Sequence, residues 1–217
     1  MSKIDELIEK LCPNGVEYKL FGDIAQISRG ASPRPIKYYI TEDKAGVNWI
    51  KIGDVEEGVK YITTTKEKIT EEGAKKSKYI KKGALILSNS MSFGRAYILA
   101  IDGCIHDGWL SISNFEKFYS TDFLYYLLST RTIQDEFKRK ATFGGAVQNL
   151  NADIVRNIIL PVPPLEIQSE IVDILDKFSN SLSKLLSLLK AEIEARQKQY
   201  EYYRDKLLTF KELVVDE

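Results

Sequence analysis

The sequence predicts an α+β protein: a globular domain built on a mixed sheet, followed by a long C-terminal α-helix that pairs as a coiled coil. Short β-rich runs, ended by glycine or proline, recur between residues 16 and 162 with few helical patterns among them. From Leu165 to about Phe210 the chain contains neither glycine nor proline, and its apolar residues recur at helical spacing. We therefore expect an N-terminal helix at residues 1–14, a globular domain at residues 15–163 and the long helix at residues 164–217.

The first elements are a short helix and two strands. Residues 2–11 have an amphipathic helical pattern that the Ser2 hydroxyl can cap, and Cys-Pro-Asn-Gly at residues 12–15 ends it. Residues 16–20 alternate as a strand does, and residues 24–27 continue in the same style. A loop follows at residues 29–35, because one glycine and two prolines interrupt it.

The middle of the chain carries more strand patterns, which lie at residues 47–52, 61–65, 83–87 and 96–101. A lysine-rich connection separates the second of them from the third. Between Lys60 and Lys82 the chain holds eight lysines against three glutamates, a surplus of five positive charges. Residues 88–95 form a loop of small hydroxyl and amide side chains between two strands, a place where such groups stay exposed.

The last part of the globular domain contains a helix, a polar loop and a final strand. Residues 122–140 have the helical period, with Ser120 or Thr121 as the cap. A loop containing two glycines covers residues 142–150, after which Asn151 can cap a single helical turn. Residues 158–162 form the last strand, and two prolines then begin the long helix, where unpaired amides tolerate proline.

One face of the long helix is apolar and needs a partner. We assign it to a dimer or partner interface made by Ile171, Leu175, Phe178, Leu182, Leu185, Leu189, Ile193, Tyr200, Tyr203 and Leu207. At ~1.5 Å per residue this helix would span roughly 65 to 70 Å, more than a domain of this size covers. The heptad register drifts after Leu189, which favours a short or imperfect coiled coil. A hairpin broken near residues 179–181 is the alternative.

The composition is that of a soluble protein of one domain and an appendage. The 217 residues hold 31 Lys and Arg against 31 Asp and Glu, and the net charge of zero does not exclude nucleic acid, because binding depends on where basic groups cluster. Two cysteines are too few for a disulfide framework or a zinc site, which favours the reducing cytoplasm. We expect no signal peptide and no membrane partner, since the Met1 segment is charged and apolar runs are short.

The search for catalytic chemistry gives no site. His106 is the single histidine, and next to Asp107 it is more typical of a core or turn residue than of a base. No P-loop or dinucleotide fingerprint occurs. Carboxylate-lysine patterns that suit a metal-dependent nuclease appear at Asp23 and again at Asp122, but two unrelated matches in a lysine- and glutamate-rich chain indicate ordinary surface charge. We expect no catalytic residue, no metal and no cofactor.

Three polar loops remain as a binding surface, because their side chains are of the kinds that read base edges and hold phosphates. The predicted DNA-binding residues are Arg29, Arg34, Lys37 and Tyr38 in the first loop (residues 29–39), Ser88, Asn89, Ser90, Ser92 and Arg95 in the second (residues 88–95), and Thr142, Gly144 and Gln148 in the third (residues 142–150). Two of the loops also have a plain interpretation: a solvated linker for the first and an ordinary hairpin turn for the second. The lysine-rich run can likewise be a solvated face.

Several motifs resemble one protein family. The runs TFGGAVQNL at residues 142–150, IILPVPPLEIQ at 158–168 and IVDILD at 171–176 are similar to the join between target-recognition domain and conserved helical region in specificity subunits of type I restriction-modification systems. The segments YKL at residues 18–20, WIKIGD at 49–54 and ALILS at 84–88 also match. The resemblance covers nearly the whole chain.

The resemblance implies a non-catalytic, sequence-specific subunit that binds double-stranded DNA. Residues 15–163 would be its target-recognition domain, methyltransferase subunits would dock at the helical region and methylate a flipped adenine, and a restriction or motor subunit would join them. Family members commonly carry two recognition domains and two helical regions, whereas this sequence has one of each and no internal repeat. We therefore expect a half-size subunit that acts as a homodimer on an interrupted palindrome.

Two other functions stay open. The first is a homodimeric coiled-coil adaptor whose globular part binds protein without reading DNA. The second is the metal-dependent nuclease. Retention of duplex DNA at low salt, with and without a methyltransferase partner, separates the adaptor from the specificity subunit, and Mg²⁺-dependent cleavage by the isolated chain would support the nuclease.

Overall fold

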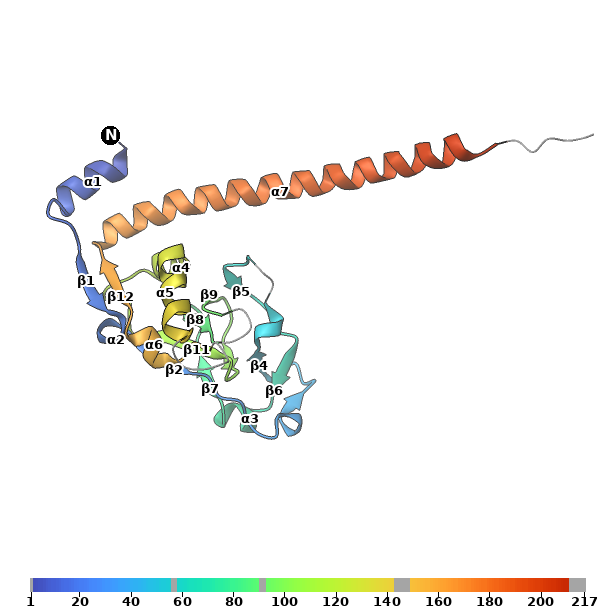
Figure 1. The fold of residues 1–217 in the computed structure, drawn as a ribbon. Helices are drawn as coiled ribbons and strands as arrows, with labels where there is room; N and C mark the ends of the chain where they lie inside the picture. The colour runs from blue at the N-terminus through green and yellow to red at the C-terminus, as the bar shows by residue number, and fades with distance from the viewer. Residues whose placement is uncertain (1, 56–57, 90–92, 143–148, 211–217) are drawn as a thin grey trace, which may run out of the picture. The chain divides into compact units, whose positions relative to one another are not determined.

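The computed structural model describes residues 2–55, 58–89, 93–142 and 149–210, without the Thr142 side chain. The chain divides into two compact units, Met1–Val172 and Asp173–Glu217. Helices and strands mix along the first unit, and a single helix makes up the described part of the second (Figure 1). The predicted α+β class is confirmed.

The two ends of the globular domain lie side by side. Helix α1 (Lys3–Leu11) begins as predicted, with a capping box between Ser2 and Asp5. Strand β1 (Glu17–Leu20) pairs antiparallel with β12 (Ile159–Val162), so the chain leaves the domain next to where it entered (Figure 1).

Two five-stranded sheets form the body of the first unit. One has the order β3 (Ile40–Thr41), β6 (Glu67–Ile69), β4 (Val47–Ile50), β10 (Gly103–Ile105), β7 (Lys78–Ile80), and the other the order β2 (Gln26–Arg29), β11 (Trp109–Ser113), β8 (Leu85–Ser88), β9 (Ala96–Leu99), β5 (Tyr61–Ile62). The pairs β4·β10 and β5·β9 are parallel and the others antiparallel, which confirms mixed pairing. The short connection from β10 to β11 joins inner strands of the two sheets.

The core has two main parts, one on each face of β8. Leu85 and Leu87 pack in the larger cluster with Leu124 and Phe137 of the helices, whereas Ile86 packs in the second cluster with Trp109. Because β8 is buried on both faces, its sequence is a continuous apolar run and does not alternate. The strand predicted at residues 83–87 is confirmed, and its apolar run is explained by the central place of β8 in its sheet.

Several short elements differ from prediction. The strand predicted at residues 24–27 begins later, as β2 at Gln26, because Ile24 belongs to the helical turn α2 (Phe21–Ile24). The connection predicted at residues 66–82 contains β6, helix α3 (Glu71–Lys75) and β7. The strands β10 and β11 were not predicted, and neither were the 3₁₀ turns η1 (Ile36–Tyr38) and η2 (Ile52–Asp54).

The predicted helix at residues 122–140 is two helices, α4 (Thr121–Leu128) and α5 (Arg131–Thr142), with Ser120 as the cap of α4. The reason for the break is local: the Ser129 hydroxyl donates to Tyr125 O at 2.7 Å and the Thr130 hydroxyl to Leu127 O at 2.8 Å. Hydroxyls that bond to the carbonyl oxygens of the preceding turn compete with the backbone amides that would continue the helix. The short helix α6 (Ala152–Arg156) begins at Asn151 as predicted.

The long helix α7 (Leu165–Leu208) runs for 44 residues without a break, so the hairpin alternative is wrong. Its first turns belong to the first unit, where Ile167 and Gln168 are buried and Ile171 packs against the core. Serine and asparagine at residues 179–181 lower helix propensity but do not end the helix. Among the described residues, no helix is long and apolar enough to cross a membrane.

Candidate nucleic-acid interface

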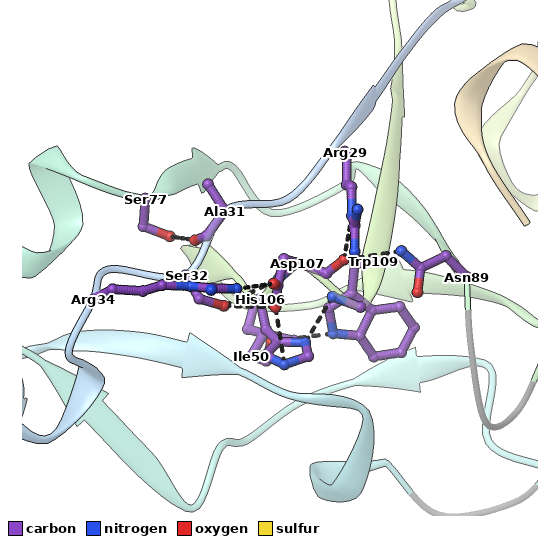
Figure 2. A network of polar contacts seen from close by, with 11 residues as sticks. Arg29, Ala31, Ser32, Arg34, Ile50, Ser77, Asn89, His106, Asp107 and Trp109 are labelled. Atoms are coloured by element: carbon purple, nitrogen blue, oxygen red, sulfur yellow. Dashed lines mark hydrogen bonds and ion pairs between the residues drawn. The ribbon is translucent and has the colours of Figure 1, made fainter. Parts of the chain in front are cut away.

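A polar network surrounds the turn that joins β10 to β11 (Figure 2). The side chain of Asn89, which is only 2% exposed, donates to Asp107 O at 2.8 Å, and its backbone amide donates to Gly108 O at 2.9 Å. Trp109 N donates to His106 O at 3.1 Å. These bonds fix the backbone of residues 106–108 from the inside of the domain.

The loop after β2 lies directly on this turn. Gly30 N donates to Trp109 O at 2.8 Å and Ala31 N to Ile105 O at 3.1 Å. A Cβ on Gly30 would stand 2.2 Å from His106 O, so only glycine allows this approach. The sequence pattern showed a loop here, but the close packing on residues 106–108 explains why the loop has this glycine.

The Asp107 carboxylate connects the turn to two side chains of the loop. Ser32 Oγ donates to Asp107 Oδ1 at 2.7 Å, and Arg34 Nη2 lies 3.3 Å from Asp107 Oδ2. In addition, Arg29 Nε donates to the Asp107 backbone oxygen at 2.7 Å. Partial burial opposes ionisation of Asp107, but the Ser32 hydrogen bond and the charges of its cationic neighbours hold its pKa below the ordinary value.

His106 is held in one tautomer by two contacts. Its Nδ1 accepts from Gly108 N at 2.8 Å, so the proton of the neutral ring is on Nε2, which lies 3.1 Å from Asp107 Oδ1. Burial lowers the pKa of His106, and the positive charges of Lys51 and Arg29 add to this effect, while Asp107 opposes it. The imidazole is therefore a neutral donor at pH 7.

A pocket of about 560 Å³ opens beside the network. Its charged lining consists of Arg34, Lys37, Lys51, Glu67 and Asp107, and His106 also contributes. Glu67 is paired with Lys51 at 2.8 Å. The lining thus contains three cations against two acids, which suits a polyanion or a base edge with acceptor atoms.

The structure gathers the predicted residues of the first loop. Arg29, Arg34 and Lys37 lie in the network or line the pocket. Tyr38 is 69% exposed at the end of η1, and the Lys37 ammonium lies 5.2 Å from the centre of its ring. The first loop therefore presents cations together with an exposed aromatic ring.

The second loop divides into buried and exposed parts. Ser88 and Asn89 are buried, and Ser88 Oγ accepts from Arg95 N at 3.1 Å, so these two side chains support the backbone of the loop. The DNA contacts predicted for them stay predictions. Arg95 is exposed and lines a different pocket of about 340 Å³ with Tyr97 and Gln134.

The remaining predicted positions lie outside the residues that the structure describes. They are Ser90, Ser92, Gly144 and Gln148, together with the side chain of Thr142. The DNA contacts predicted for them stay predictions.

Sequence reasoning missed the central role of His106 and Asp107. The sequence favoured a core or turn position for this pair, and the structure places it at a turn, but the strands on either side were not predicted. Lys51, which follows β4, was missed as well. The available signal was the Ile-His-Asp-Gly-Trp run, in which polar residues and a glycine interrupt apolar ones.

The acid of the second nuclease pattern is engaged in the fold. Asp122 lies 2.7 Å from Lys60 Nζ and accepts from the Tyr61 hydroxyl at 2.8 Å. Within the described ranges, no cluster of three or more His, Cys, Asp or Glu side chains could hold a metal ion. The nuclease interpretation gains no support from these positions.

The second unit exposes an apolar face. The predicted interface residues Phe178, Leu182, Leu185, Leu189, Ile193, Tyr200, Tyr203 and Leu207 are 49–71% exposed. Leu175 is half-buried, and Ile171 belongs to the first unit, where it packs against the core. Such a long row of exposed apolar side chains marks an interaction surface.

Comparison with known sequences gives a consistent family. The chain is 27% identical over 224 residues to the type I restriction enzyme EcoprrI specificity subunit of Escherichia coli, covering 98% of this chain and 54% of that protein. It is 29% identical over 205 residues to a second type I specificity subunit from Escherichia coli, covering 90% and 48%. The chain thus spans about half the length of these relatives.

Solved structures share the fold. The HsdS subunit from Thermoanaerobacter tengcongensis matches with a TM-score of 0.62 at 18% identity, over 91% of this chain and 47% of that one. A chain of a type I R-M system, solved to describe its complex assembly, matches with a TM-score of 0.66 at 19% identity, over 91% of this chain and 48% of that one.

The family model of the type I restriction modification DNA specificity domain matches residues 13–195. This match covers most of the sequence and shows that the chain belongs to the family of type I restriction modification DNA specificity domains.

Proposed function

We propose that this chain is the DNA-reading specificity subunit of a type I restriction-modification complex and has no catalytic activity of its own. The observation that carries the proposal is the family match over residues 13–195, which includes the whole polar network and the first thirty or so residues of α7. The complex would act on DNA in the cytoplasm.

The first loop is the main candidate for DNA contact. Arg34 and Lys37 line the pocket, Arg29 anchors the loop to the turn, and the exposed Tyr38 ring can stack on a base or sugar. Arginine bonds to guanine through two adjacent donors, and lysine holds phosphates as a point charge. Arg95, with the predicted residues next to it, would form a second contact.

The exposed face of α7 supports a homodimer. Because the chain spans about half the length of its relatives, two copies would supply two recognition domains. A two-fold axis makes their half-sites identical and inverted, which gives an interrupted palindrome with a spacing fixed by the paired helices. Methyltransferase subunits would dock at the helical region and methylate an adenine in each half-site, and a restriction subunit would complete the complex.

Methylation mapping tests this function. Adenine methylation is mapped across the genome in cells that contain a methyltransferase partner, with and without this chain. We expect an interrupted palindromic motif that disappears when the chain is removed. An unchanged methylation pattern would contradict the proposal.

Binding assays then test the adaptor alternative. An adaptor would also use the exposed apolar face of α7 to form dimers. The full-length chain, alone and with the methyltransferase, is mixed with duplex DNA at low salt. The specificity subunit is expected to retain the duplex and to prefer the mapped motif. An adaptor would form dimers and bind the partner but retain no DNA.

A further inference from the structure

We propose that Asp107 positions Arg34 for reading a guanine-type edge, meaning two adjacent hydrogen-bond acceptors on a base. This inference rests on the proposed function and adds to it a specific reader and the group that orients it. Asp107 itself contacts no DNA in this proposal.

The first step is the rigidity of the support. Residues 106–108 are held by the buried side chain of Asn89 and by the backbone of β11, and Gly30 packs against them so closely that a Cβ would not fit. A carboxylate on such a turn is fixed in place before any ligand arrives. Fixed supports are what accurate recognition requires.

The second step is the docking of the loop. Ser32 Oγ donates to the Asp107 carboxylate at 2.7 Å and lies 3.3 Å from Asp107 N, which donates back to it. This reciprocal pair sets the position of the chain two residues before Arg34. The loop therefore follows the turn and does not move independently.

The third step is the orientation of the Arg34 side chain by this carboxylate. The side chain is 82% exposed, yet Nη2 is held 3.3 Å from the carboxylate. One contact at Nη2 leaves most of the five N–H donors of a guanidinium for a ligand. An arginine that is already oriented loses less conformational freedom on binding, and its planar fork then selects bidentate acceptors.

The charge of Asp107 provides a distinguishing test. A negative group on a basic DNA-binding surface repels phosphates, so it lowers affinity for DNA of any sequence. The negative charge of Asp107 therefore lowers the affinity for DNA, and this loss is useful only if the charge also improves selectivity between sequences. Asp107→Asn should accordingly raise binding to unrelated duplexes while it reduces discrimination, a combination that a purely structural role would not produce.

The experiment uses the full chain with its methyltransferase partner, the mapped motif and a scrambled duplex. Asp107→Asn is expected to reduce the ratio of the two affinities about tenfold, with unrelated DNA bound at least as tightly as before. In an Arg34→Ala background the same substitution should change the ratio no further. Asp135→Asn is the matched control, because Asp135 is an exposed acid that pairs with Arg131 at 3.6 Å, and it should leave the ratio unchanged.

Two further arms keep the proposal falsifiable if Asp107→Asn folds poorly. Arg34→Lys, at an exposed position, should keep the charge but lose discrimination. Replacing guanine with 7-deazaguanine in the motif should weaken the wild type and leave Arg34→Ala unaffected. If Arg34→Lys retains the full ratio, or if Arg34→Ala only reduces the salt dependence as loss of a phosphate contact would, the proposal is wrong.

Failure of this inference differs from failure of the proposed function. In the first case the wild type still discriminates and these variants discriminate equally well. In the second case the wild type itself shows no preferred duplex.

Discussion

Gln168 fastens the start of α7 to the N-cap residue of α4, Ser120. Its Oε1 accepts from Ser120 N at 2.9 Å, and its Nε2 donates to Phe118 O at 2.7 Å and to Pro163 O at 2.9 Å. The amide is fully buried. The first turns of the long helix are thus tied to the globular domain by three hydrogen bonds and by the packing of Ile171 against its core.

Replacing Gln168 with alanine should lower the free energy of unfolding by about 2–4 kcal/mol, because it leaves a buried amide and two carbonyls without partners. Gln168→Glu should cost at least as much, since a carboxylate would face both carbonyls. Urea denaturation measures the change. The control is Gln197→Ala on the exposed part of α7, which should stay within about 0.5 kcal/mol of the wild type, and an equal loss in both variants would contradict the assignment.

Gly30→Ala should separate the loop from the turn at residues 106–108, because the new Cβ would meet His106 O at 2.2 Å. We expect a loss of about 2 kcal/mol or more in the free energy of unfolding and weaker DNA discrimination. Gly53→Ala is the matched control, since nothing lies within 4 Å of its Cβ position. Equal thermal melting of the two variants would show that the close approach carries no cost.

His106 offers a pH prediction that can be read without ambiguity, since the chain has a single histidine. Burial lowers its pKa below the ordinary 6.5, so the unfolded chain takes up this proton first as the pH falls. The free energy of unfolding that depends on neutral His106 is fully present above pH 6.5. It decreases as the pH falls from 6.5 to the lowered pKa of the folded state. Nitrogen NMR of the ring should show the Nε2–H tautomer and a midpoint below 6.5; a midpoint above it would contradict the contacts described.

The pairing of α7 can be tested with charges on its apolar face. Leu182→Asp and Leu189→Asp together should weaken dimerisation by about 10⁵-fold or more, because each leucine forfeits roughly 2 kcal/mol of apolar burial in each copy, about 8 kcal/mol in all. Ala191→Asp, about 180° around the helix from Leu182, is the control and should leave the dimer intact. Sedimentation equilibrium gives the constants, and a monomeric wild type would refute the homodimer.

Local signals account for the parts of the fold that could be predicted. Ser2, Ser120 and Asn151 begin helices because a hydroxyl or amide oxygen satisfies nearby backbone amides, an interaction three residues long. The unbroken α7 follows from forty-odd residues without glycine or proline. Such features lie within a single stretch of sequence and can be found there.

The polar network around Asp107 could be predicted only in part, because its partners are distant in sequence. Asp107 meets Ser32 and Arg34 across 75 and 73 positions. The amino-acid composition showed that these loops are polar. Which loops lie close together depends on the order of the strands in the sheets, and the sequence of a short strand does not specify that order. Burial could not be predicted either: Ser88 and Asn89 lie in a polar stretch of sequence, but their side chains are buried.

The pairing of β1 with β12 has an evolutionary consequence. Since Glu17 stands opposite Val162, the chain enters and leaves the globular domain at one place. A domain whose two ends lie together can be exchanged for another without redesign of the segments on either side. Recombination at these two short strands would therefore exchange the whole globular domain in one step.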